Sequence, residues 1–205
     1  MRTLLLIVFI VIQPFSNKEK ALFDAINQYD FNTLHLLIDQ NQIHDPYLAL
    51  LTKAYRNYVE KGTVYDEIAI DKVKETPYRI LMYAKYQMVL GKPYIPVIHT
   101  SLLKYSQTVK NPFLQKELSL CMIEYLQQYA QKQPHLFPLL EAYLLGIDAS
   151  SLNQIDSFSY RLLTLNILMK KSEWEKDTMS HLNIEEQLMQ LNAIRPAVNF
   201  YKAIV

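Results

Sequence analysis

The chain has 205 residues, of which 50% are hydrophobic, and its 21 basic and 20 acidic side chains leave a formal net charge of +1. A chain this apolar and this weakly charged is expected to fold, and it lacks the positive field that nucleic-acid binding requires. Its three glycines, Gly62, Gly91 and Gly146, are too far apart to form a nucleotide-binding glycine motif or a nucleophile elbow.

Residues 1–16 have the pattern of a secretory signal peptide. A positive start at Arg2 is followed by an uncharged apolar run that is broken at Pro14 and is too short for a membrane span. We expect cleavage after Ser16 and a single exported domain, periplasmic or secreted, over residues 17–205. An uncleaved membrane anchor and a buried first element of a cytosolic fold are the alternatives.

Ten helices are predicted from apolar residues that recur about every 3.6 positions. The expected ranges are 19–29, 32–40, 46–60, 77–90, 94–109, 112–131, 135–145, 152–170, 173–182 and 184–204. Residues 62–75 fit either a short helix after Asp66 or an extended connection. Because no strand-like run has a partner hairpin, the fold class is predicted to be all-α.

Capping signals define several of these boundaries. Three capping residues stand directly before a proline, in the pairs Asp45-Pro46, Thr76-Pro77 and Asn111-Pro112. Ser172 and Asn183 are each followed three positions later by a glutamate, which is the spacing of a capping box and predicts a helix start. The three glycines follow helical runs, where a left-handed C-terminal cap is expected.

The cap-proline starts recur at intervals of 31 and 35 residues, close to the period of helical-hairpin repeats. Tyr83-Ala84 in one helix, Gly91 in the turn, and a second helix that ends near Asn111-Pro112 resemble tetratricopeptide-like repeats over residues 46–145. The resemblance implies antiparallel helical hairpins stacked as a short right-handed solenoid, whose concave groove binds a protein or peptide segment. An irregular all-helical domain with coincidental spacing is the alternative.

The residues that usually carry catalysis or bind metals form no recognisable pattern. No two of the five histidines have the i, i+4 spacing of a helical metal site, and no serine or aspartate stands in a nucleophile motif. The single cysteine, Cys121, lies on an apolar helix face and is expected to be a small buried side chain. The sequence therefore indicates no cofactor, no metal and no enzyme activity, with a small helical enzyme as the third hypothesis.

Tyrosine is the distinctive residue, with 15 copies, several of them along the helices expected at 46–60 and 77–90. A ring with a polar tip suits the half-buried boundary between helices and also the wall of a binding groove. Tyr83, Tyr86 and Gln87 are the candidates for that wall. We expect an exported, non-catalytic scaffold for a protein or peptide partner, with no nucleic-acid partner and membrane contact only if the N-terminal segment is retained. The alternative is a sensor or regulatory input region of a longer or membrane-attached protein.

Overall fold

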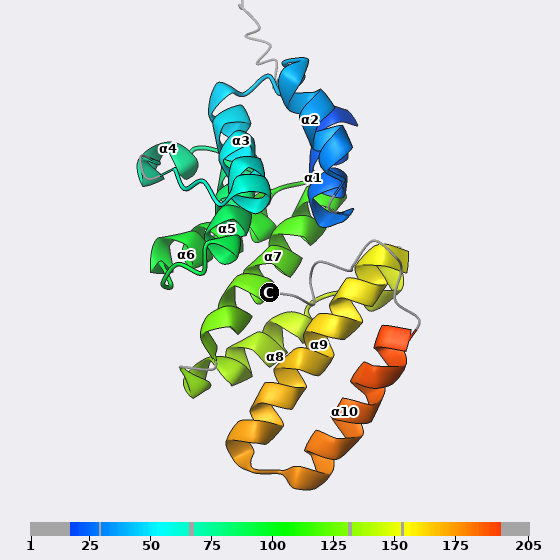
Figure 1. Ribbon diagram of the computed structural model, residues 1–205. Coiled ribbons are helices and arrows are strands. Elements are labelled where there is room, and N and C mark those ends of the chain that lie inside the picture. Colours follow the sequence, from blue (N-terminus) through cyan, green and yellow to red (C-terminus); the bar gives the residue numbers. More distant parts are fainter. Residues whose placement is uncertain (1–16, 29, 66–67, 131–132, 153, 194–205) are drawn as a thin grey trace, which may run out of the picture.

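The computed structural model describes residues 17–28, 30–65, 68–130, 133–152 and 154–193 (Figure 1). Within these ranges all regular structure is helical, which confirms the all-α class. The α-helices are α1 (Asn17–Gln28), α2 (Phe31–Asp39), α3 (Pro46–Lys61), α4 (Ile70–Val73), α5 (Pro77–Val89), α6 (Pro96–Thr108), α7 (Pro112–Ala130), α8 (Phe137–Leu145), α9 (Gln154–Glu175) and α10 (Thr178–Ala193). Short 3₁₀ turns lie at Pro134–Leu136 and Ala149–Ser151.

The expected signal peptide at 1–16 lies outside the described residues. So does the part of the last expected helix beyond residue 193. The region left open at 62–75 contains the single-turn helix α4, whereas Asp66 is outside the described part of the chain. None of the helices described here has the length and apolar character needed to cross a membrane.

The capping signals before proline are confirmed. The Asp45 carboxylate accepts hydrogen bonds from the backbone N–H groups of Tyr47 and Leu48 at 2.9 and 3.1 Å. The other two caps are Thr76, which accepts from the Arg79 N–H at 3.3 Å, and Asn111, which accepts from the Leu114 N–H at 3.0 Å. Each bond satisfies a donor that the first helical turn leaves without an intrahelical partner.

Two of the three glycine predictions are confirmed and one is wrong. Gly62 and Gly91 follow α3 and α5 with φ of +67° and +60°, in the left-handed region that only glycine adopts without strain. Gly146 has φ −76° and a right-handed conformation, because its N–H still bonds to the carbonyls of Ala142 and Tyr143 at the end of α8.

The expected helix starts at Ser172 and Asn183 are wrong. Ser172 is buried inside α9, and its hydroxyl donates to the Met169 carbonyl at 2.8 Å, so it does not cap a new helix. The chain turns instead at Lys176, which has φ +59°, and Asp177 caps α10 by accepting from the Ser180 N–H at 3.1 Å. Asn183 lies within α10. The expected helices 152–170, 173–182 and 184–204 are therefore replaced by α9 and α10.

Extensive contacts between helices join elements that are one or two places apart in the chain (Figure 1). Helix α5 packs against both α3 and α7, and α6 packs against α5 and α7. Farther along the chain, α8 contacts α7 and α9, and α10 pairs with α9. This order of packing places α7 between the N-terminal and C-terminal halves of the molecule.

Helix α1 departs from this neighbour-to-neighbour order through its side chains. The Phe23 ring stacks on the ring of Tyr78 from α5, with centroids 6.3 Å apart. The Asn27 carboxamide donates to Glu117 of α7 at 2.8 Å and accepts from Lys85 of α5 at 2.9 Å. The start of the described chain is therefore attached to its middle by contacts far apart in sequence.

Three hydrophobic clusters form the core, and α7 is shared by two of them. Its residues Leu118 and Cys121 belong to the cluster built from α1 to α7, whereas Ile123 and Leu126 belong to the cluster shared with α8 and α9. Cys121 is 1% exposed, as expected for a small buried side chain. A fully buried leucine or isoleucine contributes about 1.5–3 kcal/mol, so several on α7 outweigh a helix cap of about 1 kcal/mol.

Candidate functional site

The three residues expected to form a groove wall lie inside the helix array. Tyr83, Tyr86 and Gln87 are 7%, 0% and 7% exposed. The Tyr86 hydroxyl accepts from the Tyr65 backbone N–H at 2.9 Å, and its ring meets the Tyr58 ring edge-on at a centroid distance of 6.4 Å. Burial raises the pKa of the Tyr83 hydroxyl. Side chains this well covered serve packing between helices, and a partner would have to bind elsewhere.

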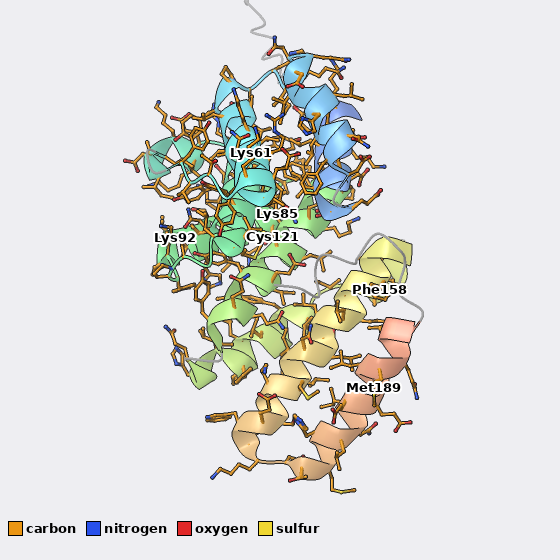
Figure 2. The ribbon with its side chains drawn as sticks, in the orientation of Figure 1. Lys61, Lys85, Lys92, Cys121, Phe158 and Met189 are labelled. Carbon is orange, nitrogen blue, oxygen red and sulfur yellow. The ribbon has the colours of Figure 1, made fainter. Side chains whose placement is uncertain are left out.

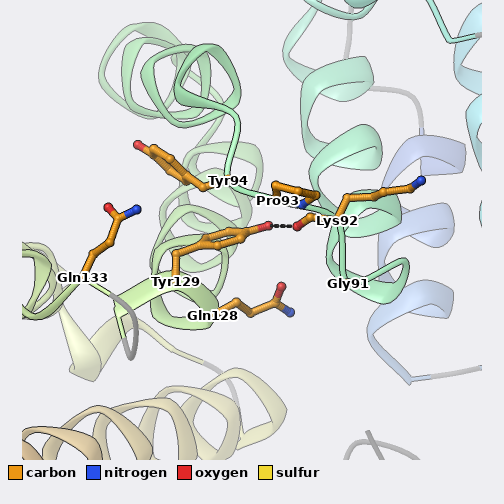
Figure 3. A pocket seen from close by; sticks show the side chains of 7 residues that line it. All are labelled: Gly91, Lys92, Pro93, Tyr94, Gln128, Tyr129 and Gln133. Carbon is orange, nitrogen blue, oxygen red and sulfur yellow. Dashed lines mark hydrogen bonds between the residues drawn. The ribbon is translucent and has the colours of Figure 1, made fainter.

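A pocket of about 440 Å³ lies where the connection from α5 to α6 crosses the C-terminal end of α7 (Figure 3). Its lining consists of Gly91, Lys92, Pro93, Tyr94, Gln128, Tyr129 and Gln133. The first four residues come from the connection, and the other three come from the last turns of α7 and the residues just after it. Two chain segments about 35 residues apart are thus brought together by the packing of α5 and α6 on α7.

The connection is shaped by the way α5 ends. Gly91 takes φ +60°, its N–H bonds to the Met88 carbonyl at 3.1 Å, and the Lys92 N–H bonds to the Gln87 carbonyl at 3.3 Å. These bonds satisfy carbonyls at the C-terminus of α5 and reverse the chain sharply. The chain therefore leaves α5 directed across α7, which brings Pro93 and Tyr94 to the pocket.

Tyrosine rings form the wall between the connection and α7. The Tyr94 and Tyr129 ring centroids are 5.3 Å apart, and Tyr125 lies 5.8 Å from Tyr94 and 5.2 Å from Tyr129. The Tyr129 hydroxyl donates to the Lys92 carbonyl at 2.7 Å, as Figure 3 shows. The buried Tyr125 hydroxyl accepts from the Ile95 N–H at 3.0 Å. Both hydroxyls therefore tie α7 to the connection.

The imidazole of His99, on α6, forms a hydrogen bond with the hydroxyl group of Tyr94. The His99 Nδ1 lies 3.0 Å from the Tyr94 hydroxyl, and its Nε2 lies 3.4 Å from the Tyr143 hydroxyl. Burial lowers the pKa of His99, so the imidazole is neutral at pH 7, with one nitrogen donating and the other accepting. Burial likewise raises the pKa values of the Tyr94 and Tyr129 hydroxyls, which keeps both protonated.

The lining of the pocket is mainly uncharged and includes two aromatic rings. Its lining offers aromatic faces, the Pro93 ring and the carboxamides of Gln128 and Gln133, and Lys92 is the one ionised group among the lining residues that the structure describes. Among the described lining residues there is no carboxylate, thiol or serine, and the Tyr129 hydroxyl donates its proton to the Lys92 carbonyl.

A polar cluster joins α1, α5 and α7 around Lys85. Figure 2 marks the position of Lys85 in the fold. Burial disfavours the charged form of Lys85, but the negative charges of Glu124 and Glu117 outweigh burial and raise its pKa above the ordinary value. A lysine held in its protonated form is neither a nucleophile nor a base. The cluster holds α1 against α5 and α7. In the ranges described above, no group of three or more His, Cys, Asp or Glu is arranged to hold a metal ion.

The sequence reasoning did not select Tyr94, Tyr129, Gln128 or Gln133 as site residues. On α7, Gln128 is exposed and Tyr129 is partly buried. Two features of the sequence could have indicated them. Gly91, Pro93 and Tyr94 stand together in one helix break, and Tyr125 and Tyr129 lie four positions apart near the end of a helix. Without the helix packing, nothing connects these two segments.

No family model, curated protein or solved structure matches the chain. What the protein binds is therefore inferred from the pocket itself.

Proposed function

We propose that the protein is a non-catalytic helical scaffold that binds a peptide segment of a partner protein, and that the pocket at Tyr94 and Tyr129 is its recognition site. The observation that carries the proposal is this pocket, in which two tyrosine rings and two carboxamides surround about 440 Å³. Tyrosine is enriched among the residues that dominate binding energy at protein interfaces, because it combines a large apolar area with few rotatable bonds.

The arrangement of the rings before binding supports the proposal. Tyr129 is held by its hydrogen bond to the Lys92 carbonyl, and Tyr94 is held by His99. The buried ring of Tyr125 contacts both of them. A ligand therefore meets walls whose side chains are already ordered, which reduces the entropy that binding would otherwise cost.

The proposal also includes the finer fold expected from the tetratricopeptide resemblance. The packing of α5 against both α3 and α7 is compatible with a short solenoid of helical hairpins, although α1 adds contacts to α5 and α7 that a strictly serial array would lack. In this proposal the recognition site lies on the α5–α6 connection and the end of α7, and the buried positions Tyr83, Tyr86 and Gln87 have no contact with the partner.

The test is selection of random twelve-residue peptides, displayed on phage, against the purified protein. We expect enriched peptides whose affinity falls at least about tenfold, or about 1.4 kcal/mol, in Tyr94→Ala. Gln128→Ala removes only an exposed carboxamide and should also weaken binding, while Gln115→Ala, on the exposed face of α7 outside the pocket, serves as the matched control. Far-UV circular dichroism establishes that each variant is folded.

Two results would contradict this function. The first is the absence of any enriched peptide, and the second is enrichment of peptides that bind the wild-type protein and the two pocket variants equally.

A further inference from the structure

We propose that the outward face of α10 binds an amphipathic helix of a partner protein that carries lysine or arginine beside its apolar side chains. The outward face is defined by five exposed residues, which are Met179, Leu182, Glu185, Glu186 and Met189. Helix α10 contributes no residue to the lining of the pocket at Tyr94 and Tyr129. The inference therefore adds a second contact surface, which does not depend on the proposed function of the pocket.

Helix α10 has two apolar faces, and only one of them is covered in the described part of the chain. Ile184 and Leu191 are buried in the cluster shared with α9. Met179, Leu182 and Met189 are 79%, 55% and 62% exposed. Because successive residues turn by about 100° around a helix axis, the three exposed side chains lie within about 80° of one another, opposite the buried pair. A helix that is apolar on opposite sides is typically covered on both.

The shape of the outward face suits a helix. Figure 1 shows α10 at the edge of the molecule, and its extensive contacts with described helices are those with α9. Met189, labelled in Figure 2, and Met179 lie about 15 Å apart along the helix axis, at about 1.5 Å a residue. A partner helix of about four turns spans this length with apolar side chains at i, i+3, i+4 and i+7. The unbranched methionines can adapt to its surface.

The charge of the outward face selects the kind of helix. Helix α10 contains Glu185 and Glu186 but no lysine or arginine. Within the described residues neither carboxylate has an ion-pair partner, since Lys170 and Lys171 of α9 pair with other glutamates. Carboxylates beside an apolar stripe attract a cationic partner and repel an anionic one. Charge complementarity therefore favours lysine or arginine next to the apolar side chains of the partner.

The same charges disfavour two other occupants of the outward face. The two glutamates lie near the middle of the stripe that runs from Met179 to Met189. A two-fold contact with a second copy of the chain that covers the whole stripe would bring four carboxylates together, because each surface then meets its own equivalent. Anionic lipid headgroups would be repelled in the same way. A basic amphipathic helix satisfies both the apolar stripe and the carboxylates.

The experiment measures fluorescence anisotropy of a labelled 18-residue probe peptide with the full chain. The probe consists of leucine and lysine, with its leucines at i, i+3, i+4 and i+7 along one helical face. It has two matched partners, one with every lysine replaced by glutamate and one with the same composition but with the leucines spread around the helix. We expect the wild-type protein to bind the probe at least about tenfold more tightly than either partner.

Two variants of the protein locate the binding on α10. Met189→Gln should weaken binding of the probe about fivefold or more, whereas Leu36→Gln, at an exposed apolar position of α2, is the matched control and should not. Glu186→Lys should remove most of the preference for lysine over glutamate in the peptide. Asp71→Lys, on exposed α4, changes the net charge by the same amount and should keep that preference.

Four outcomes would overturn the inference. The first is equal binding of the probe and its glutamate partner, and the second is equal binding of the probe to wild type and Met189→Gln. The third is a wild-type dimer in analytical ultracentrifugation that Met189→Gln dissociates, which would assign the outward face to a second copy. The fourth is binding of the probe only after Arg195→Glu and Lys202→Glu, which would assign the outward face to the chain's own residues 194–205.

Discussion

Asp45 and Arg79 together connect three helices. Asp45 caps α3 and also accepts from the Arg79 Nε of α5 at 2.7 Å, while another nitrogen of Arg79 donates to the Lys72 carbonyl of α4 at 3.1 Å. The Arg79 guanidinium also lies over the Tyr47 ring, 5.3 Å from its centroid. Burial alone would raise the pKa of Asp45, but the bonds from Arg79 and the two backbone N–H groups hold it below its ordinary value.

Replacing Asp45 should destabilise the protein through the loss of two separable interactions. We expect Asp45→Ala to cost about 2 kcal/mol in urea unfolding, about half from the lost cap and half from the lost ion pair. Asp45→Asn keeps a capping acceptor and should lose only the stability that the ion pair with Arg79 contributes. The control is Asp71→Ala, which removes an exposed ion pair with Lys74 and should leave the unfolding midpoint nearly unchanged.

The difference between the wild-type protein and Asp45→Asn should depend on pH. Because the folded state lowers the pKa of Asp45 from 3.8, its charge stabilises the fold fully above pH about 4 and loses this effect as the pH falls below that value. Urea titrations at several pH values between about 6 and about 2.5 measure the difference. A difference that stays constant over this range would contradict the role given to the carboxylate charge.

Gly91 and Gly146 offer a matched test of backbone conformation. Gly91 has φ +60°, and no atom lies within 4 Å of the position that an added methyl group would take, so Gly91→Ala should cost about 1 kcal/mol through backbone strain alone. Gly146 has φ −76°, so Gly146→Ala should be neutral or stabilising by up to about 1 kcal/mol. Unfolding midpoints of the two variants measure the contrast, and equal effects would contradict the assigned conformations.

At the scale of elements, helix α1 is attached to α5 and α7 in part by a polar contact. Asn27 bridges Lys85 and Glu117, and Glu117 is only 3% exposed. A hydrogen bond contributes about 0.5–1.5 kcal/mol net, so the two made by Asn27 contribute about 1–3 kcal/mol. This contact adds to the apolar contacts of Phe23 in attaching α1 to α5 and α7.

We expect Asn27→Ala to reduce stability by about 1–3 kcal/mol and to increase amide hydrogen exchange in α1 more than in α7. Asn32→Ala, at an exposed position of α2, is the control and should change neither quantity. Exchange followed by mass spectrometry measures the effect on each helix. If α1 stayed as protected in the variant as in the wild-type protein, the bridge would not hold the helix.

At the scale of the whole molecule, the helices contribute unequally to the hydrophobic core. Helix α7 contributes buried side chains to two hydrophobic clusters, whereas α10 contributes Ile184 and Leu191 to a third cluster whose other described members come from α9. Three large apolar residues on α10 are among those exposed, namely Met179, Leu182 and Met189. A helix that buries so little is held to the rest of the molecule by a small free energy.

Helix α10 should therefore open before the rest of the fold. We expect its amides to exchange at a lower opening free energy than those of α7, and the gap to close as urea brings the whole protein to unfolding. Native-state hydrogen exchange at increasing urea concentration measures both helices at once. If α7 and α10 exchanged together at the free energy of global unfolding, the fold would be one cooperative unit.

Local signals in the sequence account for most of the helices and for their starts. Apolar spacing identified the helices up to α8, apart from the single turn α4, and the capping residues before Pro46, Pro77 and Pro112 placed three of their starts. These signals act within one or two turns, because a cap bonds to the backbone N–H groups of its own first turn. Ser172 shows the limit of such reasoning, since its capping-box spacing is present but burial against α10 keeps it helical.

The pocket is formed by tertiary structure, because its lining residues come from two separate segments of the chain. Whether a tyrosine is covered depends on which helix crosses it. Tyr86 and Tyr129 both lie near the end of a helix, a few positions after another tyrosine, yet the first is fully buried and the second is partly exposed. Hydrophobic periodicity shows which face of a helix turns inward, but it does not show how two segments about 35 residues apart meet. The packing of α5 and α6 on α7 brings them together, and it buries apolar residues of all three helices.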